Sequence, residues 1–180
     1  MSTLFHLFEQ RQSCRSYQSK PVEPEKLDAC IRAARLAPSA CNSQPWRFIV
    51  VNEPQRVEQL AKCVQETGMN RFTDGCTAFV VILEGNQSLS ARFGGAMKDQ
   101  KYAGIDIGLA TAQLVLTAAD EGLGSCILGW FNERKLKILL GIPKVRRVRL
   151  VVALGYAAEG DPLREKQRKP LEEIVSYNKF

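Results

Sequence analysis

Histidine is nearly absent from this chain of 180 residues, in which His6 is the only one. A catalytic triad or a metal site that uses imidazole would have to be built around that single side chain. The six cysteines offer no help, because no two of them have the C-x-x-C spacing of a zinc site or a thioredoxin-type redox motif. We therefore expect no bound metal, and we disfavour a hydrolase with a histidine-activated nucleophile.

Long apolar runs and the glycine motifs of nucleotide binding are missing as well. The longest wholly apolar run, Ala78–Leu83, is far shorter than the ~20 residues that cross a bilayer, and no secretion signal is recognisable at the N-terminus. We expect no membrane partner, a cytoplasmic location, and reduced cysteines that act as small buried apolar side chains. Neither G-x-G-x-x-G nor G-x-x-x-x-G-K-[ST] occurs, which argues against the Rossmann and P-loop modes of nucleotide binding.

The charge balance is moderate. The chain has 25 Lys and Arg against 19 Asp and Glu, a net charge of +6 that is ordinary for its size. No dense basic stripe alternates with aromatic residues, so we expect no nucleic acid partner. An apolar content of 45% is enough for a sizeable core and is consistent with a single domain over residues 1–180.

The order of the expected strands and helices predicts an α+β or mixed α/β fold with three layers, in which helices flank a central mixed or antiparallel sheet. The expected helices span 3–12, 24–37, 54–66, 101–121 and 132–140. The expected strands span 46–51, 78–83, 125–128 and 147–155. We expect a long loop over 84–100. The helix at 101–121 is apolar nearly all round and is expected in a core or an interface, and the tail at 156–180 is expected to pack on a partner chain.

Three polar clusters have no core-packing explanation. Residues 11–15 place two guanidinium groups beside a hydroxyl, which suits phosphate and polyol oxygens, although a solvated basic loop explains this cluster better when it is taken alone. Residues 37–46 hold polar side chains between two prolines that fix the backbone, and the Asn and Gln amides suit a heterocycle edge. A simple helix–strand connector explains Pro38 and Asn42 but not Gln44 and Trp46. Residues 164–170 are basic and, alone, are best explained as a charged surface tail.

Taken together, these segments resemble the nitroreductase family of FMN-dependent oxidoreductases. The resemblance runs from about Leu4 to Val175 and consists of six motifs in the right order. They are RQSCR at 11–15, APSACNSQPWRFIVV at 37–51, NRFT at 70–73 leading into AFVV at 78–81, IDIGLA at 105–110 through GLGS at 122–125, LGWFN at 128–132, and RKPL at 168–171.

The resemblance implies a homodimer with two FMN sites at the subunit interface. Arg11, Ser13 and Arg15 would reach the phosphate, the ribityl chain and the pyrimidine edge. Pro38, Ser39, Ala40 and Asn42 would come from the opposite subunit, with Gln44 close by. Asn70 would face the flavin ring, and the backbone of Leu128 and Gly129 would approach flavin N5 and O4. The implied cofactor-binding residues are Arg11, Gln12, Ser13, Arg15, Pro38, Ser39, Ala40, Asn42, Gln44, Asn70, Leu128, Gly129, Lys166 and Arg168, of which the last two would pair with the phosphate.

The resemblance also implies the reaction. Hydride would pass from NAD(P)H to flavin N5 and then to a small-molecule electron acceptor, such as a nitroaromatic or a quinone, in a ping-pong mechanism. FMN would carry the chemistry, so no catalytic residue is expected, and Arg15 would tune the flavin. Two alternatives remain open: a specialised branch that performs reductive dehalogenation or flavin cleavage, and a flavin-binding sensor without turnover. Bleaching of the flavin by anaerobic NADH or NADPH, followed by recolouring with an acceptor, would separate an enzyme from a sensor.

Overall fold

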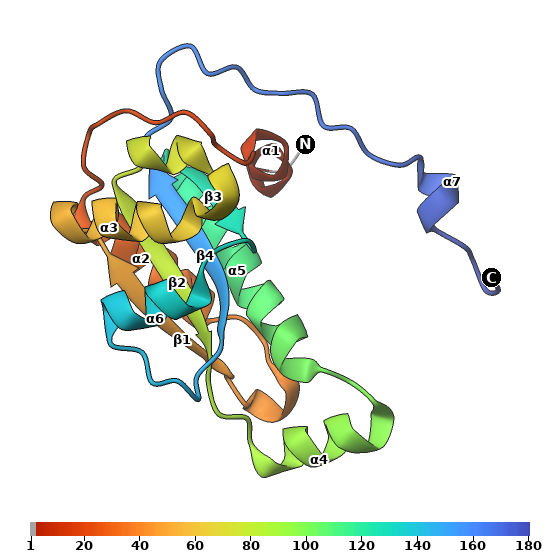
Figure 1. The fold of residues 1–180 in the computed structure, drawn as a ribbon. Coiled ribbons are helices and arrows are strands. Elements are labelled where there is room, and N and C mark those ends of the chain that lie inside the picture. The colour runs from red at the N-terminus through yellow and green to blue at the C-terminus, as the bar shows by residue number, and fades with distance from the viewer. Residues whose placement is uncertain (1–2) are drawn as a thin grey trace.

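A four-stranded sheet forms the centre of the computed structural model, which describes residues 3–180 (Figure 1). Its order is β1-β2-β4-β3, and every neighbouring pair is antiparallel. The strands are β1 (Trp46–Val51), β2 (Ala78–Glu84), β3 (Gly124–Leu128) and β4 (Val148–Gly155). The predicted strands are confirmed. The prediction left open a mixed or an antiparallel sheet, and the sheet is antiparallel.

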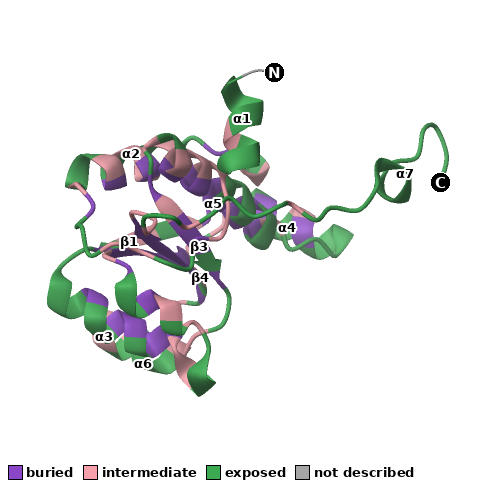
Figure 2. Cartoon of the chain, turned by 90° about the horizontal axis from the view of Figure 1, so that it is seen from above, coloured by how far each residue is buried: buried purple, intermediate pink, exposed green. Residues whose placement is uncertain are grey.

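Helices cover both faces of the sheet and complete the predicted three layers. Figure 2 shows α2 (Pro24–Arg35) and α5 (Tyr102–Asp120) on one face, with α3 (Pro54–Val64) and α6 (Glu133–Leu140) on the other. Alternate side chains of a strand point to opposite faces, so β2 contributes Val80 and Ile82 to one core and Phe79 and Val81 to the other. The α+β class predicted from the sequence is confirmed.

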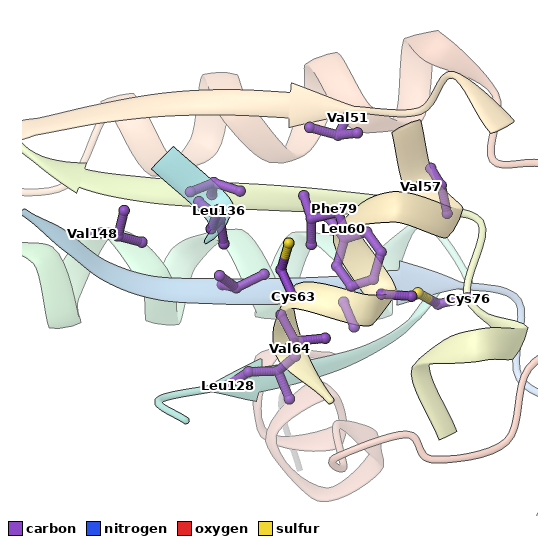
Figure 3. Packing of buried hydrophobic residues seen from close by; sticks show 14 of the residues in the cluster. Val51, Val57, Leu60, Cys63, Val64, Cys76, Phe79, Leu128, Leu136 and Val148 are labelled. Atoms are coloured by element: carbon purple, nitrogen blue, oxygen red, sulfur yellow. The ribbon is translucent and has the colours of Figure 1, made fainter. Parts of the chain in front are cut away.

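The core beneath α3 and α6 is closely packed (Figure 3). Leu60 and Val64 of α3 and Leu136 of α6 are fully buried against Phe79 of β2. Full burial of one such side chain stabilises the fold by about 1.5–3 kcal/mol. These contacts fix α3 and α6 on the sheet, and with them the chain segments that follow each helix.

The long helix α5 is buried on one side only. Ile107, Ala110 and Leu114 are buried against the sheet and α2, whereas Ile105 and Leu109 are 53% and 42% exposed. By length and composition alone, α5 could cross a membrane, a test that buried core helices also pass; 44% of its apolar window is buried in this fold. The expectation of a core helix is thus met on one face, and the other face is uncovered in the single chain.

The prediction of a continuous loop over 84–100 is wrong, because Leu89–Lys98 forms a helix, α4. Ser88 caps its N-terminus by accepting a hydrogen bond from the Ala91 amide at 3.2 Å. Two glycines in this segment suggested a loop, since each costs about 1 kcal/mol in a helix. Gly95 is needed for close packing instead: a Cβ there would lie 2.7 Å from the Gln100 carbonyl oxygen.

Both ends of the described chain are exposed. Helix α1 (Thr3–Gln10) has no buried residue. The C-terminal tail contacts the segment after α1 and then runs away from the body to a short helix, α7 (Leu171–Ile174) (Figure 1). All six cysteines are free, and five of them are buried as expected. Cys41 is exposed, contrary to the general expectation, because it lies in the surface turn between α2 and β1.

A hydrogen bond from Tyr156 at the end of β4 to Glu23 at the N-terminus of α2, 2.6 Å long, gives a pH-dependent contribution to stability. It is the main cause that lowers the pKa of Glu23 from 4.5 to about 2, and Lys20 contributes as well. A depressed carboxyl pKa stabilises the fold above the unfolded-state value, and this contribution is lost as the pH falls through the folded-state value. Tyr156→Phe keeps the ring that Lys20 contacts but removes the bond.

We therefore expect Tyr156→Phe to lower the free energy of unfolding at neutral pH. The difference from the parent should shrink as the pH falls from 4.5 toward 2, as measured by urea denaturation. Tyr177→Phe, in the exposed tail, is the matched control and should match the parent throughout. A parent-to-variant difference that stays constant across this pH window would contradict the assignment.

Candidate functional site

The segment 11–15 lies along the free edge of β3. Ser13 forms a parallel bridge with Ser125, and the Cys14 amide donates to the Ser125 carbonyl at 2.9 Å. Cys14 is buried so closely against Gly124 that a Cβ on that glycine would lie 2.7 Å from its sulfur. The absence of a side chain at position 124 therefore lets the N-terminal segment approach the strand.

The C-terminal tail crosses this segment and is clamped to it by Gln12. The Gln12 amide donates to the Pro162 carbonyl at 3.1 Å, and its oxygen accepts from the Arg164 amide at 3.0 Å. The Arg164 guanidinium adds a bond to the Ser13 carbonyl at 2.6 Å. Two of the three polar clusters in the sequence, about 150 residues apart along the chain, are thus brought together.

Three cations gather where the tail crosses, and we call Arg11, Lys166 and Arg168 the basic cluster. The pKa of Lys166 is lowered, first by partial desolvation and then by the positive charges of Arg11 and Arg168. Glu9 acts in the opposite direction and has the smallest effect of the four. The cluster therefore repels itself in the single chain and is suited to an anion with several oxygen atoms.

Ser13 and Arg15 continue this arrangement along β3. Burial raises the pKa of the Cys126 thiol, and Arg15 and Ser13 both partly offset that rise, which places them beside the middle of the strand. At the end of β3, Leu128 is buried and Gly129 is exposed, with no atom near the position a Cβ would take. Six predicted site residues thus follow one strand edge and the turn after it: Arg11, Gln12, Ser13, Arg15, Leu128 and Gly129.

Asn70 supports that turn from the side of α3. Its amide group donates to the Val64 carbonyl at 3.0 Å and to the Trp130 carbonyl at 3.1 Å. Asn132 adds a second tie through its backbone amide, 2.8 Å from the Cys63 carbonyl. Both amide hydrogens of Asn70 are therefore used within the chain, and only its side-chain oxygen is left to face a ligand.

The segment between Pro38 and Pro45 folds into a turn with unusual backbone angles. Cys41, Asn42 and Gln44 have φ values of 51°, 49° and 45°. Such conformations cost on the order of 1–3 kcal/mol each and persist only where surrounding contacts impose them. One contact is the Ser39 hydroxyl, which accepts from the Gln44 amide at 2.9 Å, and another links the Gln44 side-chain amide to the Asn42 side-chain oxygen at 3.0 Å.

A further contact of this turn comes from Asp106, a residue that sequence reasoning missed. Its two carboxylate oxygens accept from the Ala40 amide at 3.2 and 3.3 Å, and the side chain is only 3% exposed. An acid is costly to bury unless it accepts hydrogen bonds. An aspartate in the apolar first half of the helix was the available signal, and it indicates a polar contact that α5 makes to another segment.

The two groups of predicted residues lie at opposite ends of α5. The turn at 39–44 is tied to Asp106 near the start of the helix, whereas Arg11 and Gln12 share a surface hollow with Ala119 and Gly122 at its end. Thirteen residues separate Asp106 from Ala119, which is about 20 Å at the helical rise of 1.5 Å per residue. Figure 1 shows the turn between α2 and β1 at the opposite end of α5 from α1. One chain therefore brings Lys166 and Arg168 to Arg11 but does not bring to them the turn that contains Pro38, Ser39, Ala40, Asn42 and Gln44.

This combination of fold and polar clusters is shared with known proteins. The model of the nitroreductase family matches residues 8–156. The chain belongs to the nitroreductase family. An Archaeoglobus fulgidus protein with the provisional name NADH dehydrogenase/NAD(P)H nitroreductase is 33% identical over 150 residues, which cover 81% of this chain and 80% of that protein. Family membership and these relatives make the chain an oxidoreductase enzyme.

Further relatives show how widely the nitroreductase fold is shared. A nitroreductase family protein from Streptococcus pneumoniae superposes with a TM-score of 0.81 at 25% identity, covering 97% of this chain and all of that one. Rat iodotyrosine deiodinase 1 is 26% identical over 193 aligned positions, which cover 95% of this chain and 68% of the rat protein. Proteins similar to this chain thus carry names that refer to different reactions.

The bond between Asp106 and Ala40 leads to a test that needs no ligand. Asp106→Ala leaves the Ala40 amide without its acceptor, so we expect a loss of about 1 kcal/mol in unfolding free energy. Hydrogen exchange of the amides at 40–44 should speed up, while that of residues 11–15 should not change.

Thr111→Val is the matched control, because the buried Thr111 hydroxyl donates to the Ile107 carbonyl of its own helix. It should leave exchange at 40–44 unchanged. Equal exchange of this turn in Asp106→Ala and in the parent would show that Asp106 does not hold it.

Proposed function

We propose that the chain is an FMN-dependent oxidoreductase that takes electrons from NAD(P)H and passes them to nitroaromatic, quinone or similar small acceptors. The observation that carries the proposal is the basic cluster, in which Arg11 and Arg168 both lie close enough to Lys166 to lower its pKa, beside the edge of β3. Because the chain belongs to the nitroreductase family, we infer that the anion bound by these three cations would be a flavin phosphate. A Clostridium difficile structure with the nitroreductase fold, 24% identical over 98% of this chain and with a TM-score of 0.76, is named as FMN-dependent.

The residues along β3 fit FMN by their chemistry. Arg11, Lys166 and Arg168 would hold the phosphate, and Ser13 and Gln12 offer polar atoms for the ribityl chain. Gly129 leaves room at the turn because no side chain projects there, so the backbone of Leu128 and Gly129 would contact the ring. FMN, when bound, supplies the two-electron chemistry.

The protein's own part in the reaction is to bind, orient and tune. Arg15 would provide a fixed cation on the strand edge, where negative charge of the reduced cofactor gathers. Asn70 would hold the turn at 128–130 in place and offer its free side-chain oxygen. No side chain has to move a proton, which is consistent with the single histidine, His6, on the exposed helix α1.

A homodimer would complete the site. The turn containing Pro38, Ser39, Ala40, Asn42 and Gln44 lies about 20 Å along α5 from the other cluster, so a second chain would bring it there. The exposed apolar face of α5, with Ile105 and Leu109, and the exposed Leu171 and Ile174 of α7 offer surface for such an interface. In this arrangement the single domain of each chain would extend its tail, residues 156–180, over its partner.

Reductive dehalogenation is the second candidate, favoured by the iodotyrosine deiodinase relatives that align with almost the whole chain. The same flavin site would serve it, and the acceptor would differ. Anaerobic reduction with NADH or NADPH, followed by addition of a nitroaromatic in one sample and a halophenol in another, separates the two. Faster reoxidation by the nitroaromatic supports the first function, and halide release supports the second.

Removal of single cations from the basic cluster tests the proposal. Lys166→Ala and Arg168→Ala should each cost about 2 kcal/mol of FMN binding, or roughly 30-fold in Kd, because a charge-assisted hydrogen bond to the phosphate is lost. Titration of apo-protein with FMN, followed by quenching of flavin fluorescence, measures this loss. Riboflavin, which has no phosphate, should bind the variants and the parent equally.

Lys169→Ala is the matched control, since Lys169 lies in the same tail but is 73% exposed and 4.0 Å from Glu173. It should bind FMN like the parent. Equal weakening of FMN and riboflavin by Arg168→Ala would show that this arginine does not hold the phosphate.

A further inference from the structure

The chain that follows β4 pairs with the segment that follows α1, and this pairing leads to the basic cluster. Tyr17 and Ala157 form an antiparallel bridge, and the Ala158 amide donates to the Ser16 carbonyl at 3.0 Å. Because the two segments run in opposite directions, the residues after 158 extend toward residues 13 to 11. The place of the tail on the flavin-binding strand is therefore decided where this pairing ends.

Arg164 makes the contacts at that end. Its guanidinium donates to the Ser13 carbonyl at 2.6 Å, and its backbone amide donates to the Gln12 side-chain oxygen at 3.0 Å. The Cys14 amide belongs to the same peptide group as the Ser13 carbonyl, and it donates to the Ser125 carbonyl of β3 at 2.9 Å. This peptide group is thus held by Arg164 on one side and by the sheet on the other.

Asp161 fixes Arg164 in this position. One of its carboxylate oxygens lies 3.5 Å from the guanidinium, and the Asp161 side chain is 11% exposed. Its other oxygen is buried and has no hydrogen bond within residues 3–180. A carboxylate in such a place depends on the partner it has, because an unpaired buried charge is costly. The charge of Arg164 is therefore offset within the chain, and in this it differs from the basic cluster.

The tail beyond Arg164 is weakly attached. Lys166 is half-buried and donates to the Glu9 carbonyl of α1, whereas Arg168 is exposed and donates to the carbonyl of its own neighbour, Gln167. The like charges of the basic cluster repel one another, so they do not hold the tail in place. The contacts of Arg164 come directly before the two cations and are suited to that role.

We propose that Arg164 is a positioning residue for the phosphate of FMN, an inference that rests on the proposed function. Together with Asp161 and Gln12 it fixes the tail at Ser13, and this sets the place of the two tail cations of the basic cluster. Arg164 does not contact the phosphate itself, because its guanidinium is bonded to Ser13 and Asp161.

Flavin titrations of Arg164→Ala and Asp161→Asn test the proposal. Each variant should bind FMN about tenfold more weakly than the parent, because each releases the tail from its anchor. Riboflavin has no phosphate and should bind both variants like the parent, which also shows that they are folded. A direct phosphate ligand would behave differently, since Asp161→Asn would then free the Arg164 charge and tighten FMN binding. Quenching of flavin fluorescence on titration of apo-protein measures both affinities.

A double-mutant cycle separates an action through the tail cations from an action on the phosphate. In a chain that already carries Lys166→Ala and Arg168→Ala, Arg164→Ala should cost no further FMN affinity, because the residues through which it acts are gone. An additive loss in that background would show that Arg164 acts on the phosphate directly, and would overturn the proposal.

Arg56→Ala is the matched control. Arg56 also pairs with an acid three residues before it, Glu53, at 3.1 Å, and it donates to a carbonyl distant in the sequence, that of Leu139, at 3.4 Å. It lies on α3, away from the tail. Arg56→Ala should bind FMN and riboflavin like the parent.

Hydrogen exchange of the apo-protein tests the anchor without flavin. The amide of residue 164 is bonded to Gln12 in the parent, so it should exchange faster in Arg164→Ala and Asp161→Asn and at the parent's rate in Arg56→Ala. Unchanged exchange, or equal weakening of FMN and riboflavin, would overturn the proposal. A parent that bound no FMN would overturn the proposed function as well, whereas a parent that binds FMN no better than both variants would overturn this inference alone.

Discussion

The 19-residue helix α5 separates the two groups of polar residues that the nitroreductase motifs supply. Asp106 near its start holds the turn at 39–44, and its far end supports the segment that runs from Arg11 to Arg15 along β3. A helix cannot shorten without breaking its hydrogen bonds, so the distance of about 20 Å between the groups is fixed. The proposed dimer follows from this fixed distance. A second chain can bring its turn at 39–44 to the basic cluster of the first chain, which the first chain's own turn cannot reach.

The energetics of the clusters agree with such an arrangement. Each chain holds a group of cations that repel one another, and a turn with three residues in the left-handed region. Neither feature stabilises the isolated chain. Both are maintained by the packed sheet, by the carboxylate of Asp106 and by the Gln12 clamp on the tail. Binding of an anionic ligand between two chains would relieve the repulsion and cover the exposed apolar face of α5.

The sequence predicted most of the fold because the deciding signals were local. The apolar run from Ala78 to Leu83 specified the central strand, and Asn132 and Gly141 marked the two ends of α6, where the structure has them as caps. Helix α4 was missed because hydrophobic periodicity does not show why a glycine is needed in it, namely the close approach of Gly95 to Gln100 where the chain turns after the helix.

The candidate site was predicted less evenly. The motifs identified segments correctly, yet the contacts between them depend on tertiary structure: Gln12 with the tail, Asn70 with Trp130, and Asp106 with Ala40. Arg164 is another example, because its contacts form only when the tail is placed on the N-terminal segment. Contacts between residues that are distant in the sequence cannot be predicted from the local pattern of one sequence.

Complementation between two defective chains tests the central claim, that each flavin site is shared between subunits. One chain carries Lys166→Ala with Arg168→Ala, and the other carries Asp106→Ala; each is first shown to lose FMN when purified by itself. In a heterodimer of the two, one site collects both defects and the other is intact. Refolding an equal mixture should therefore restore FMN to about a quarter of the parent loading, as the two-fold symmetry of a dimer requires. A mixture that binds no more FMN than its separate components would contradict a site built from two chains.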